Sequence, residues 1–181
     1  MLRLIAATAA ASLALAACAP TATRPPAGGA PLFALAPSAL PGGLVEQQRL
    51  AFEHGDRRET VDAMVQADAD TVRLVIHTQG QVALRLDWDG VRLAQKRMPG
   101  LPASLDGARV LSDLQLVFWP VDALRAQLPA GWTLDEQGGR RTLKDAKGIV
   151  ARVEREDADT RLLDQVRLRY RLRIDSVPVT P

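Results

Sequence analysis

The sequence predicts a mainly β protein in which a pair of helices interrupts an antiparallel meander of strands. Apolar and polar residues alternate through residues 72–88 and again through 166–174, as half-buried strands require. Between these regions, residues 106–119 carry apolar side chains at helical spacing. Because the chain has 181 residues, we expect one domain with a single core.

The composition narrows the classes of function. The formal net charge is +2, which gives no electrostatic basis for binding nucleic acid. Hydrophobic residues make up 47% of the chain and aromatic residues 4%, so aliphatic side chains must fill the core. With one cysteine and two histidines, the chain can form no internal disulfide, and we expect neither a metal site nor a cofactor.

Residues 1–17 are typical of a secretory signal peptide that is removed. Met1-Leu2-Arg3 gives a positively charged start, and residues 4–14 form a short apolar stretch. Leu15-Ala16-Ala17-Cys18 is similar to the processing box of bacterial lipoproteins, in which the cysteine is acylated and becomes the first mature residue. Acyl chains such as palmitate contribute ~0.8 kcal/mol for each buried CH₂. We therefore expect a lipid anchor on Cys18; an uncleaved anchor helix and a plain secretory signal are the alternatives.

The segment after the cysteine predicts a location and a tether. In Gram-negative lipoproteins an aspartate at this position is the usual signal for retention in the inner membrane, and Ala19 stands there instead. This resembles default sorting to the outer membrane, facing the periplasm. Residues 18–41 are rich in proline and glycine, a composition that stays extended and packs no core. We expect a tether there and the folded domain over residues 42–181.

Residues 72–88 are expected to form a β-hairpin. Their large apolar side chains alternate on both sides of residues 79–81, and a three-residue loop there places them on one face. A slip of one residue would move all of them to the opposite face. The expected pairs are Thr78 with Val82, Ile76 with Leu84, Leu74 with Leu86 and Val72 with Trp88.

Two further turns extend this hairpin on either side. Asp89-Gly90 favours a two-residue type I′ turn, because both residues accept a positive φ. Residues 67–70 are expected to form a four-residue turn upstream. The expected pairs are Trp88 with Val91 and Leu86 with Leu93 at the first turn, and Val65 with Val72 and Val61 with Ile76 at the second.

Residues 106–119 are expected to form a helix that is apolar over most of its surface. Pro120 suits the first turn of a second short helix, which Pro129 ends. We expect this helix pair to be inserted into the sheet. The apolar residues of the first helix are Val110, Leu111, Leu114, Leu116, Val117, Phe118 and Trp119, and the residues on its remaining face are Arg109, Ser112, Asp113 and Gln115.

Strands are expected to resume after Gly131. The Gly138-Gly139 turn sets Leu134 opposite Leu143, and residues 149–153 form the next strand. The final strand carries apolar residues on one face and arginines on the other, which predicts a long strand with one wet face. A solvated face is the simpler interpretation of these arginines, and contact with lipid phosphates or an acidic partner is the alternative. The apolar residues are Val166, Leu168, Tyr170, Leu172 and Ile174, and the basic ones are Arg167, Arg169, Arg171 and Arg173.

Four stretches of the mature chain carry a resemblance to known proteins. They are Glu46-Gln47-Gln48-Arg49-Leu50, Arg57-Arg58-Glu59-Thr60, Asp113-Leu114-Gln115-Leu116-Val117-Phe118-Trp119-Pro120 and residues 162–173. With them, the mature chain resembles the superfamily of outer-membrane lipoprotein carriers and receptors, LolA and LolB, and within it an uncharacterised family of Gram-negative lipoproteins. The likeness covers residues 41–177 and rests on stretches that bear the fold, not on a catalytic signature.

The resemblance implies an incomplete β-barrel of about 8–11 strands that encloses a hydrophobic cavity for acyl chains under a helical lid. One feature departs from the receptor type. The Gln79-Gly80-Gln81 loop is short and polar where the receptor carries a protruding hydrophobic residue, so insertion of lipoproteins into a membrane is not implied. The cavity is expected to be lined by Leu74, Ile76, Leu84, Leu86, Trp88, Leu114, Phe118, Leu168, Tyr170 and Leu172; for each of these residues, a filled core is the alternative.

Two hypotheses of function follow. In the first, the protein is held on the outer membrane by its lipid and binds or relays an acylated or otherwise hydrophobic molecule. In the second, the domain has a solid core and acts as an envelope-assembly accessory that contacts protein partners. We expect no enzymatic activity, because no nucleophile has a plausible base and no phosphate-binding glycine loop or metal-ligand spacing is present in the sequence.

Overall fold

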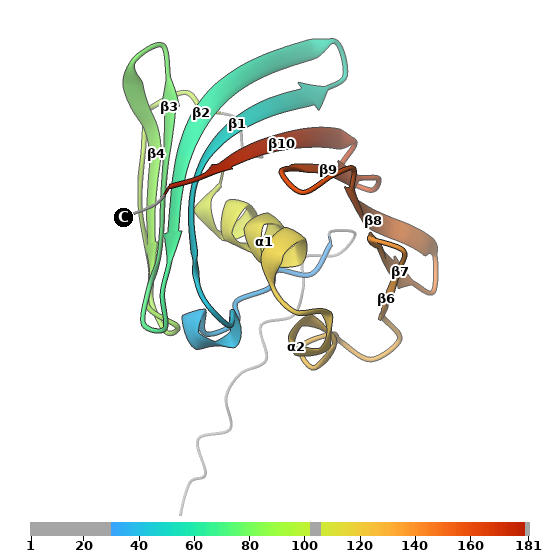
Figure 1. Cartoon of the computed structure of the whole chain (residues 1–181). Helices are drawn as coiled ribbons and strands as arrows, with labels where there is room; N and C mark the ends of the chain where they lie inside the picture. The colour runs from blue at the N-terminus through green and yellow to red at the C-terminus, as the bar shows by residue number, and fades with distance from the viewer. Residues whose placement is uncertain (1–29, 102–105, 180–181) are drawn as a thin grey trace, which may run out of the picture.

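A computed structural model describes residues 30–101 and 106–179 (Figure 1). The chain forms a 3₁₀ helix, ten strands and two α-helices in these ranges. In chain order they are η1 (Pro37–Ala39), β1 (Leu44–His54), β2 (Arg57–Ala67), β3 (Val72–Thr78), β4 (Gln81–Trp88), β5 (Leu93–Arg97), α1 (Gly107–Phe118), α2 (Val121–Arg125), β6 (Thr133–Gln137), β7 (Arg140–Asp145), β8 (Gly148–Arg155), β9 (Thr160–Gln165) and β10 (Tyr170–Pro178).

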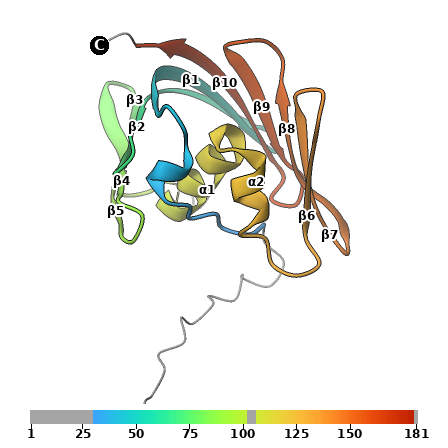
Figure 2. The ribbon, with the colours of Figure 1, turned by 60° about the horizontal axis from the view of Figure 1, so that its bottom comes forward.

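All ten strands belong to one antiparallel sheet, in the order β5-β4-β3-β2-β1-β10-β9-β8-β7-β6. Two meanders, β1 to β5 and β6 to β10, are therefore joined where the first strand pairs with the last. The sheet is open, with β5 and β6 at its edges, and it curves around α1 (Figures 1 and 2). The predicted mainly β fold, with a curved antiparallel sheet and an inserted helix pair, is confirmed.

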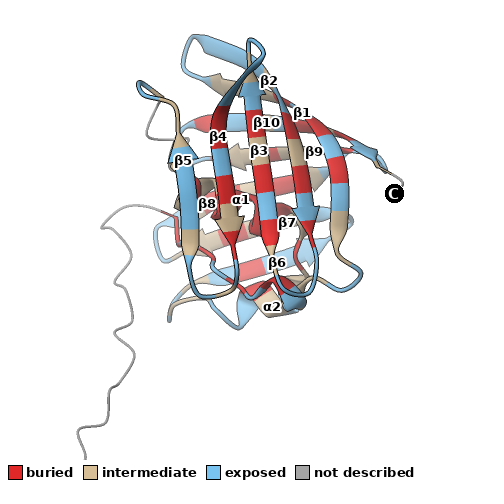
Figure 3. Cartoon of the chain, turned by 90° about the vertical axis from the view of Figure 1, so that its left-hand side faces the viewer, coloured by how far each residue is buried: buried red, intermediate tan, exposed pale blue. Residues whose placement is uncertain are grey.

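The predicted pairing of β3 with β4 is confirmed at three of its four positions. Inward and outward residues alternate along both strands, as Figure 3 shows by burial. The fourth predicted pair, Thr78 with Val82, is wrong. Gln79 and Gly80 form a two-residue turn with φ angles of 49° and 74°, which pairs Thr78 with Gln81. A register shift after Ile76 then restores the expected match.

At the other two predicted turns of the first meander the strand pairing is displaced by two residues, and an aspartate side chain organises each turn. Asp89 Oδ1 accepts hydrogen bonds from the backbone N–H groups of Val91 and Arg92, at 2.8 and 2.7 Å. Asp68 Oδ1 accepts hydrogen bonds in the same way from the backbone N–H groups of Asp70 and Thr71, at 2.9 and 2.7 Å. Trp88 therefore pairs with Leu93 and Leu86 with Gln95, while Val65 pairs with Leu74 and Ala63 with Ile76.

In the second meander, the predicted pair of Leu134 with Leu143 is confirmed, but the single long final strand is wrong. Residues 166–169 instead turn the chain between β9 and β10, and Arg169 adopts a left-handed φ of 60°. Nothing in the period-two pattern marks this turn, which contains neither glycine nor proline. Only Tyr170, Leu172 and Ile174 remain on the inner face of β10.

The predicted tether is wrong over its C-terminal part. Residues 30–36, which we call the N-terminal strap, run in an extended conformation beside α1 (Figure 2). Ala30, Phe33 and Leu35 are buried in the core, at 1%, 3% and 3% exposure. The folded domain therefore begins at residue 30 or earlier. The predicted signal peptide, Cys18 and the rest of the tether lie outside the described residues. Within the described ranges, neither helix is long and apolar enough to cross a membrane.

Candidate binding cavity

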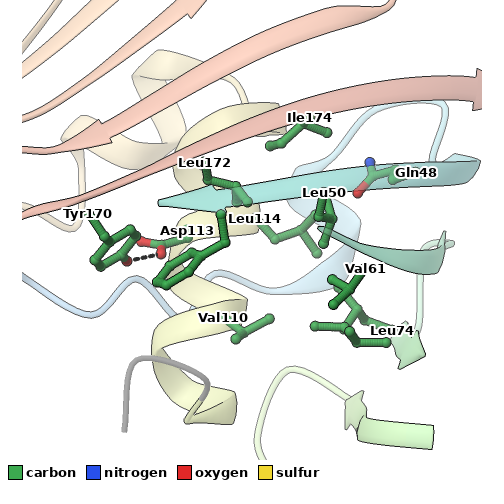
Figure 4. A pocket seen from close by; sticks show the side chains of 12 residues that line it. Gln48, Leu50, Val61, Leu74, Val110, Asp113, Leu114, Tyr170, Leu172 and Ile174 are labelled. Carbon is green, nitrogen blue, oxygen red and sulfur yellow. Dashed lines mark hydrogen bonds between the residues drawn. The ribbon is translucent and has the colours of Figure 1, made fainter. Parts of the chain in front are cut away.

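A small cavity of about 70 Å³ lies between α1 and the concave face of the sheet (Figure 4). Strands β1, β2, β3 and β10 supply one wall and α1 supplies the other. Ten of the twelve lining side chains carry an aliphatic or aromatic group. The lining residues are Gln48, Leu50, Phe52, Val61, Leu74, Ile76, Val110, Asp113, Leu114, Tyr170, Leu172 and Ile174.

The cavity reaches the surface on one side. Phe52, Val61, Val110 and Leu172 are half-buried, whereas the other lining residues are buried. Val61 lies on the part of β2 that extends beyond β3, because β3 pairs with β2 only from Asp62 onward. The sheet therefore ends beside the cavity there, and this edge forms its mouth.

Five of the ten predicted cavity residues line the cavity: Leu74, Ile76, Leu114, Tyr170 and Leu172. The other five do not. Leu84, Leu86 and Trp88 on β4 are buried in a filled part of the core, where the Trp88 indole N–H donates to the carbonyl of Leu35 at 2.8 Å. Phe118 packs under the guanidinium of Arg161 at 4.7 Å, and Leu168 lies in the turn before β10.

Sequence reasoning missed the contribution of β1. Leu50 and Phe52 lie two residues apart between Arg49 and Glu53, which is a strand signal, but the inward positions before them are Glu46 and Gln48. These two buried polar residues break the apolar pattern that marked β3 and β4. The even-numbered residues of β1 would have been found only by following the alternation through polar positions.

A buried polar cluster closes the cavity at the Tyr170 end (Figure 4). Asp113 Oδ2 accepts a hydrogen bond from the Tyr170 hydroxyl, and Oδ1 accepts one from Gln165 Nε2 at 2.7 Å. Arg109 lies 3.9 Å from the same carboxylate. Burial raises the pKa of Asp113 to about 6, although all three neighbours act to lower it. Burial and the Asp113 charge also raise the pKa of Tyr170.

The opposite face of α1 binds the N-terminal strap. Ser112 Oγ accepts from the backbone N–H of Phe33 at 3.0 Å, and Gln115 makes two hydrogen bonds of 2.9 Å with the N–H and carbonyl of Leu35. Arg109 donates to the carbonyl of Ala30 at 2.9 Å. Three of the four residues of the predicted polar helix face, Arg109, Ser112 and Gln115, therefore bind the strap backbone and replace the partner strand that it lacks, whereas Asp113 faces the cavity.

Both ends of α1 are fixed as well. At its start, Gly107 N donates to Gln95 Oε1 of β5 at 2.8 Å, and a Cβ at this glycine would lie 2.5 Å from that oxygen. Asp106 caps the helix by accepting from Ala108 N. At its end, Arg141 of β7 donates to the carbonyls of Leu116 and Trp119 at 2.7 and 2.8 Å. Helix α1 is thus an internal element, not a surface lid.

Residues 45–178 match a family described as "Protein of unknown function (DUF3261)". The chain belongs to this family. No curated protein matches the chain. The matched range covers all but the first residue of the DUF3261 sheet and every lining residue of the cavity, and it leaves out the strap. The likeness to LolA and LolB remains a prediction.

Three of the four arginines that the sequence places on the outer face of the DUF3261 domain, Arg167, Arg171 and Arg173, are engaged with acids. Arg173 pairs with Glu156 and Asp175 at 2.7 and 3.0 Å, and Arg171 lies 3.8 Å from Asp164. Arg167 in the preceding turn hydrogen-bonds the carboxylate of Asp145 and lowers its pKa to about 2. This face is therefore a set of ion pairs of mixed sign, with no single-sign field to attract phosphates.

Proposed function

We propose that the protein binds an acylated or otherwise hydrophobic molecule in the cavity between α1 and the concave face of the sheet. The observation that carries the proposal is an apolar cavity with a half-buried mouth, inside a curved sheet that otherwise packs tightly. Removal of acyl CH₂ groups from water would drive binding, at roughly 25 cal/mol per Å². Specificity for the apolar part would be loose, because burial is not directional.

The predicted lipid on Cys18 would hold this domain on the outer membrane, facing the periplasm. The sequence resemblance to lipoprotein carriers and receptors supports the same proposal. A lipid-anchored domain with an apolar cavity is suited to accept a hydrophobic molecule and to relay it at the membrane.

The size of the cavity decides how it must work. Its volume of about 70 Å³ is well below the ~300–1,000 Å³ of ordinary small-molecule sites, so an acyl chain requires the gap to widen. Because α1 is fixed by the strap, Gln95 and Arg141, we propose that the sheet yields instead of the helix. The part of β2 around Val61 has no β3 neighbour and pairs only with β1, so movement there disturbs one strand pairing instead of two.

One observation favours the alternative function. The same small volume, together with the filled packing around Leu84 and Trp88, suits an envelope accessory protein with a solid core. Such a protein would act through its surface, and its cavity would be an incidental packing defect.

Native mass spectrometry of the full chain, purified from a periplasmic expression host, separates the two functions. The wild type should carry co-purified lipid masses. Val61→Phe should lose them, because the larger ring fills the cavity from its mouth. Val82→Phe is the matched control, since Val82 is 49% exposed on the outer side of β4. Ligand-free wild type that also fails to bind an acyl probe would contradict lipid binding and favour the accessory function.

A further inference from the structure

The concave face changes character along β1, β10 and β9. In the row of Phe52 the inner residues of all three strands are apolar, the row of Leu50 includes Arg161, and the row of Gln48 is polar. The antiparallel register brings these residues into rows across the strands. From the apolar end the rows are Phe52, Leu172 and Leu163; then Leu50, Ile174 and Arg161; then Gln48 and Ser176.

Two polar groups in these last rows are buried without a partner among the described residues. Ser176 is 5% exposed, and its hydroxyl makes no hydrogen bond within these ranges. Arg161 Nη1 is equally enclosed, and its guanidinium stacks on Phe118 at the end of α1. Buried polar atoms in proteins almost always have a partner, and an unpaired hydrogen of a charged group is the costliest exception. Both groups can donate to an oxygen.

Charged groups of both signs surround Arg161. Burial is the largest influence on Arg161 and lowers its pKa; among its charged neighbours, Arg155 and Arg141 act in the same direction and Glu46 and Asp159 oppose it. Arg141 already pairs with Glu136 at 3.2 Å. The Glu46 carboxylate accepts from Gln48 Nε2 at 2.9 Å, and within the described ranges no ion pair joins it to Arg161. The buried, unpaired Nη1 of Arg161, and not a net positive field, therefore points to an acceptor here.

The two ends of the cavity differ in the hydrogen-bond donors that they offer. At the Tyr170 end, Asp113 is already saturated by Tyr170 and Gln165 and would repel an anion. Next to the Gln48 end, Arg161 and Ser176 offer unpaired donors. Neither lines the cavity itself, but their strand partners Ile174 and Gln48 do. From Ile174 to Tyr170 the apolar wall extends about 13 Å along β10, at ~3.3 Å per residue. Arg161 and Phe118 are half-buried, so a group held there remains near solvent.

We infer that Arg161 and Ser176 form a head-group site for an anionic amphiphile, whose carboxylate or phosphate accepts hydrogen bonds from both side chains while its acyl chain occupies the cavity. The inference rests on the proposed function, because it specifies the class of ligand for the same cavity. It makes the ligand an acyl acid or acyl phosphate, not a neutral lipid.

The test uses two fluorescent probes that differ only in charge, dansyl-undecanoic acid and its methyl ester. Each is titrated into the full chain carrying Cys18→Ser, so that no lipid is attached at that residue. The acid should bind about tenfold tighter than the ester, as expected for a charge-assisted hydrogen bond. Arg161→Met should weaken the acid to the affinity of the ester and leave the ester unchanged.

Three controls keep the result specific. Arg171→Met removes an outward arginine from β10 and should change neither probe. Ser176→Ala should weaken the acid by about threefold, as a single neutral donor would. Arg161→Lys should retain part of the preference for the acid, and with Ser176→Ala it decides the matter if Arg161→Met does not fold. Sodium acetate and inorganic phosphate, each without an acyl chain, should not compete at the concentrations of probe used.

The outcomes separate the two proposals. Equal affinity for acid and ester in the wild type, or equal weakening of both by Arg161→Met, would overturn the head-group site and leave hydrophobic binding intact. Competition by free phosphate or acetate at probe concentration would assign the donors to a free anion and also overturn it. If neither probe binds, the proposed function itself fails, and the inference fails with it.

Discussion

The two halves of the concave face differ in what covers them. Along β4, the strap and η1 lie over the sheet, and Leu84, Leu86 and Trp88 are buried in a filled core. Along β1, β2, β3 and β10, α1 faces the sheet, and a cavity remains between Val110, Leu114 and the strands. The same alternation of apolar residues thus gives a solid core in one half and a binding cavity in the other. Covering elements, more than the strands, decide where a ligand fits.

Truncating one leucine in each half should give the largest difference in unfolding free energy between the two halves. Leu84→Ala removes a side chain with no exposure from the filled half and should cost about 3–4 kcal/mol of unfolding free energy. Leu172→Ala removes a half-buried side chain that already borders the cavity and should cost about 1–2 kcal/mol. Chemical denaturation measures both. Equal costs would mean that the two halves are packed alike.

The stability of the cavity half should also depend on pH, because Asp113 beside the cavity has a raised pKa. Burial raises the folded-state pKa of Asp113 to about 6, so the folded protein keeps a proton that the unfolded chain has lost above pH ~4. Stability from this group is complete below pH ~4 and is lost as pH rises through about 6, by roughly 2–3 kcal/mol.

Asp113→Asn should remove this loss of stability at rising pH without affecting the acids whose pKa values are lowered. Those acids, such as Asp145, contribute stability that is lost only as the pH falls below the ordinary pKa of a carboxyl group. Denaturation of wild type and variant between pH 4 and pH 7 isolates the difference. Asp62→Asn, at an exposed position, is the control. Parallel curves for wild type and Asp113→Asn would show that Asp113 is not protonated in this range.

On the covered side of α1, Gln115→Ala should cost about 2 kcal/mol, because it leaves the Leu35 N–H buried and unpaired. The Leu35 carbonyl keeps its hydrogen bond from Trp88. Hydrogen exchange should show faster exchange at the amides of Phe33 and Leu35, with β8 amides unchanged. Unaltered exchange at the strap would mean that apolar packing alone holds it.

The smallest effect is expected on the outer face. Arg173→Ala breaks exposed ion pairs with Glu156 and Asp175 and should cost less than about 1 kcal/mol. High salt should reduce even this difference. A larger loss of unfolding free energy would show that the outward arginines stabilise the fold and are more than a solvated surface.

The sequence predicted best where inward residues alternate without interruption. Leu74 with Leu86 and Leu134 with Leu143 follow from the pattern, because any slip would expose them. The turns were harder. Asp68 and Asp89 both bind the backbone through their side chains; the turn at Asp68 lies one residue later than predicted, and the loop at Asp89 is two residues longer. The alternation alone carries no sign of this.

The strap and the cavity could not be predicted for a different reason. The strap follows a segment rich in proline and glycine, and its backbone is bonded by side chains of α1 far along the chain instead of by a strand. The cavity depends on how closely α1 approaches β1 and β10, which is set by Arg141 and Gln95 in distant elements. Asp113 was placed correctly on the helix, but its burial beside Tyr170 depends on the turn that ends β9.

The pairing of β1 with β10 also has a consequence for how the chain folds. Leu50 pairs with Ile174, so the middle of the sheet forms only when nearly the whole chain is available. Each meander contains mainly local contacts and can assemble early, whereas their junction carries most of the loop-closure cost. Until that junction forms, the inner edge of β1 is an open strand edge of the kind that promotes aggregation. Slow, late closure at this seam is therefore the expected kinetic signature of the fold.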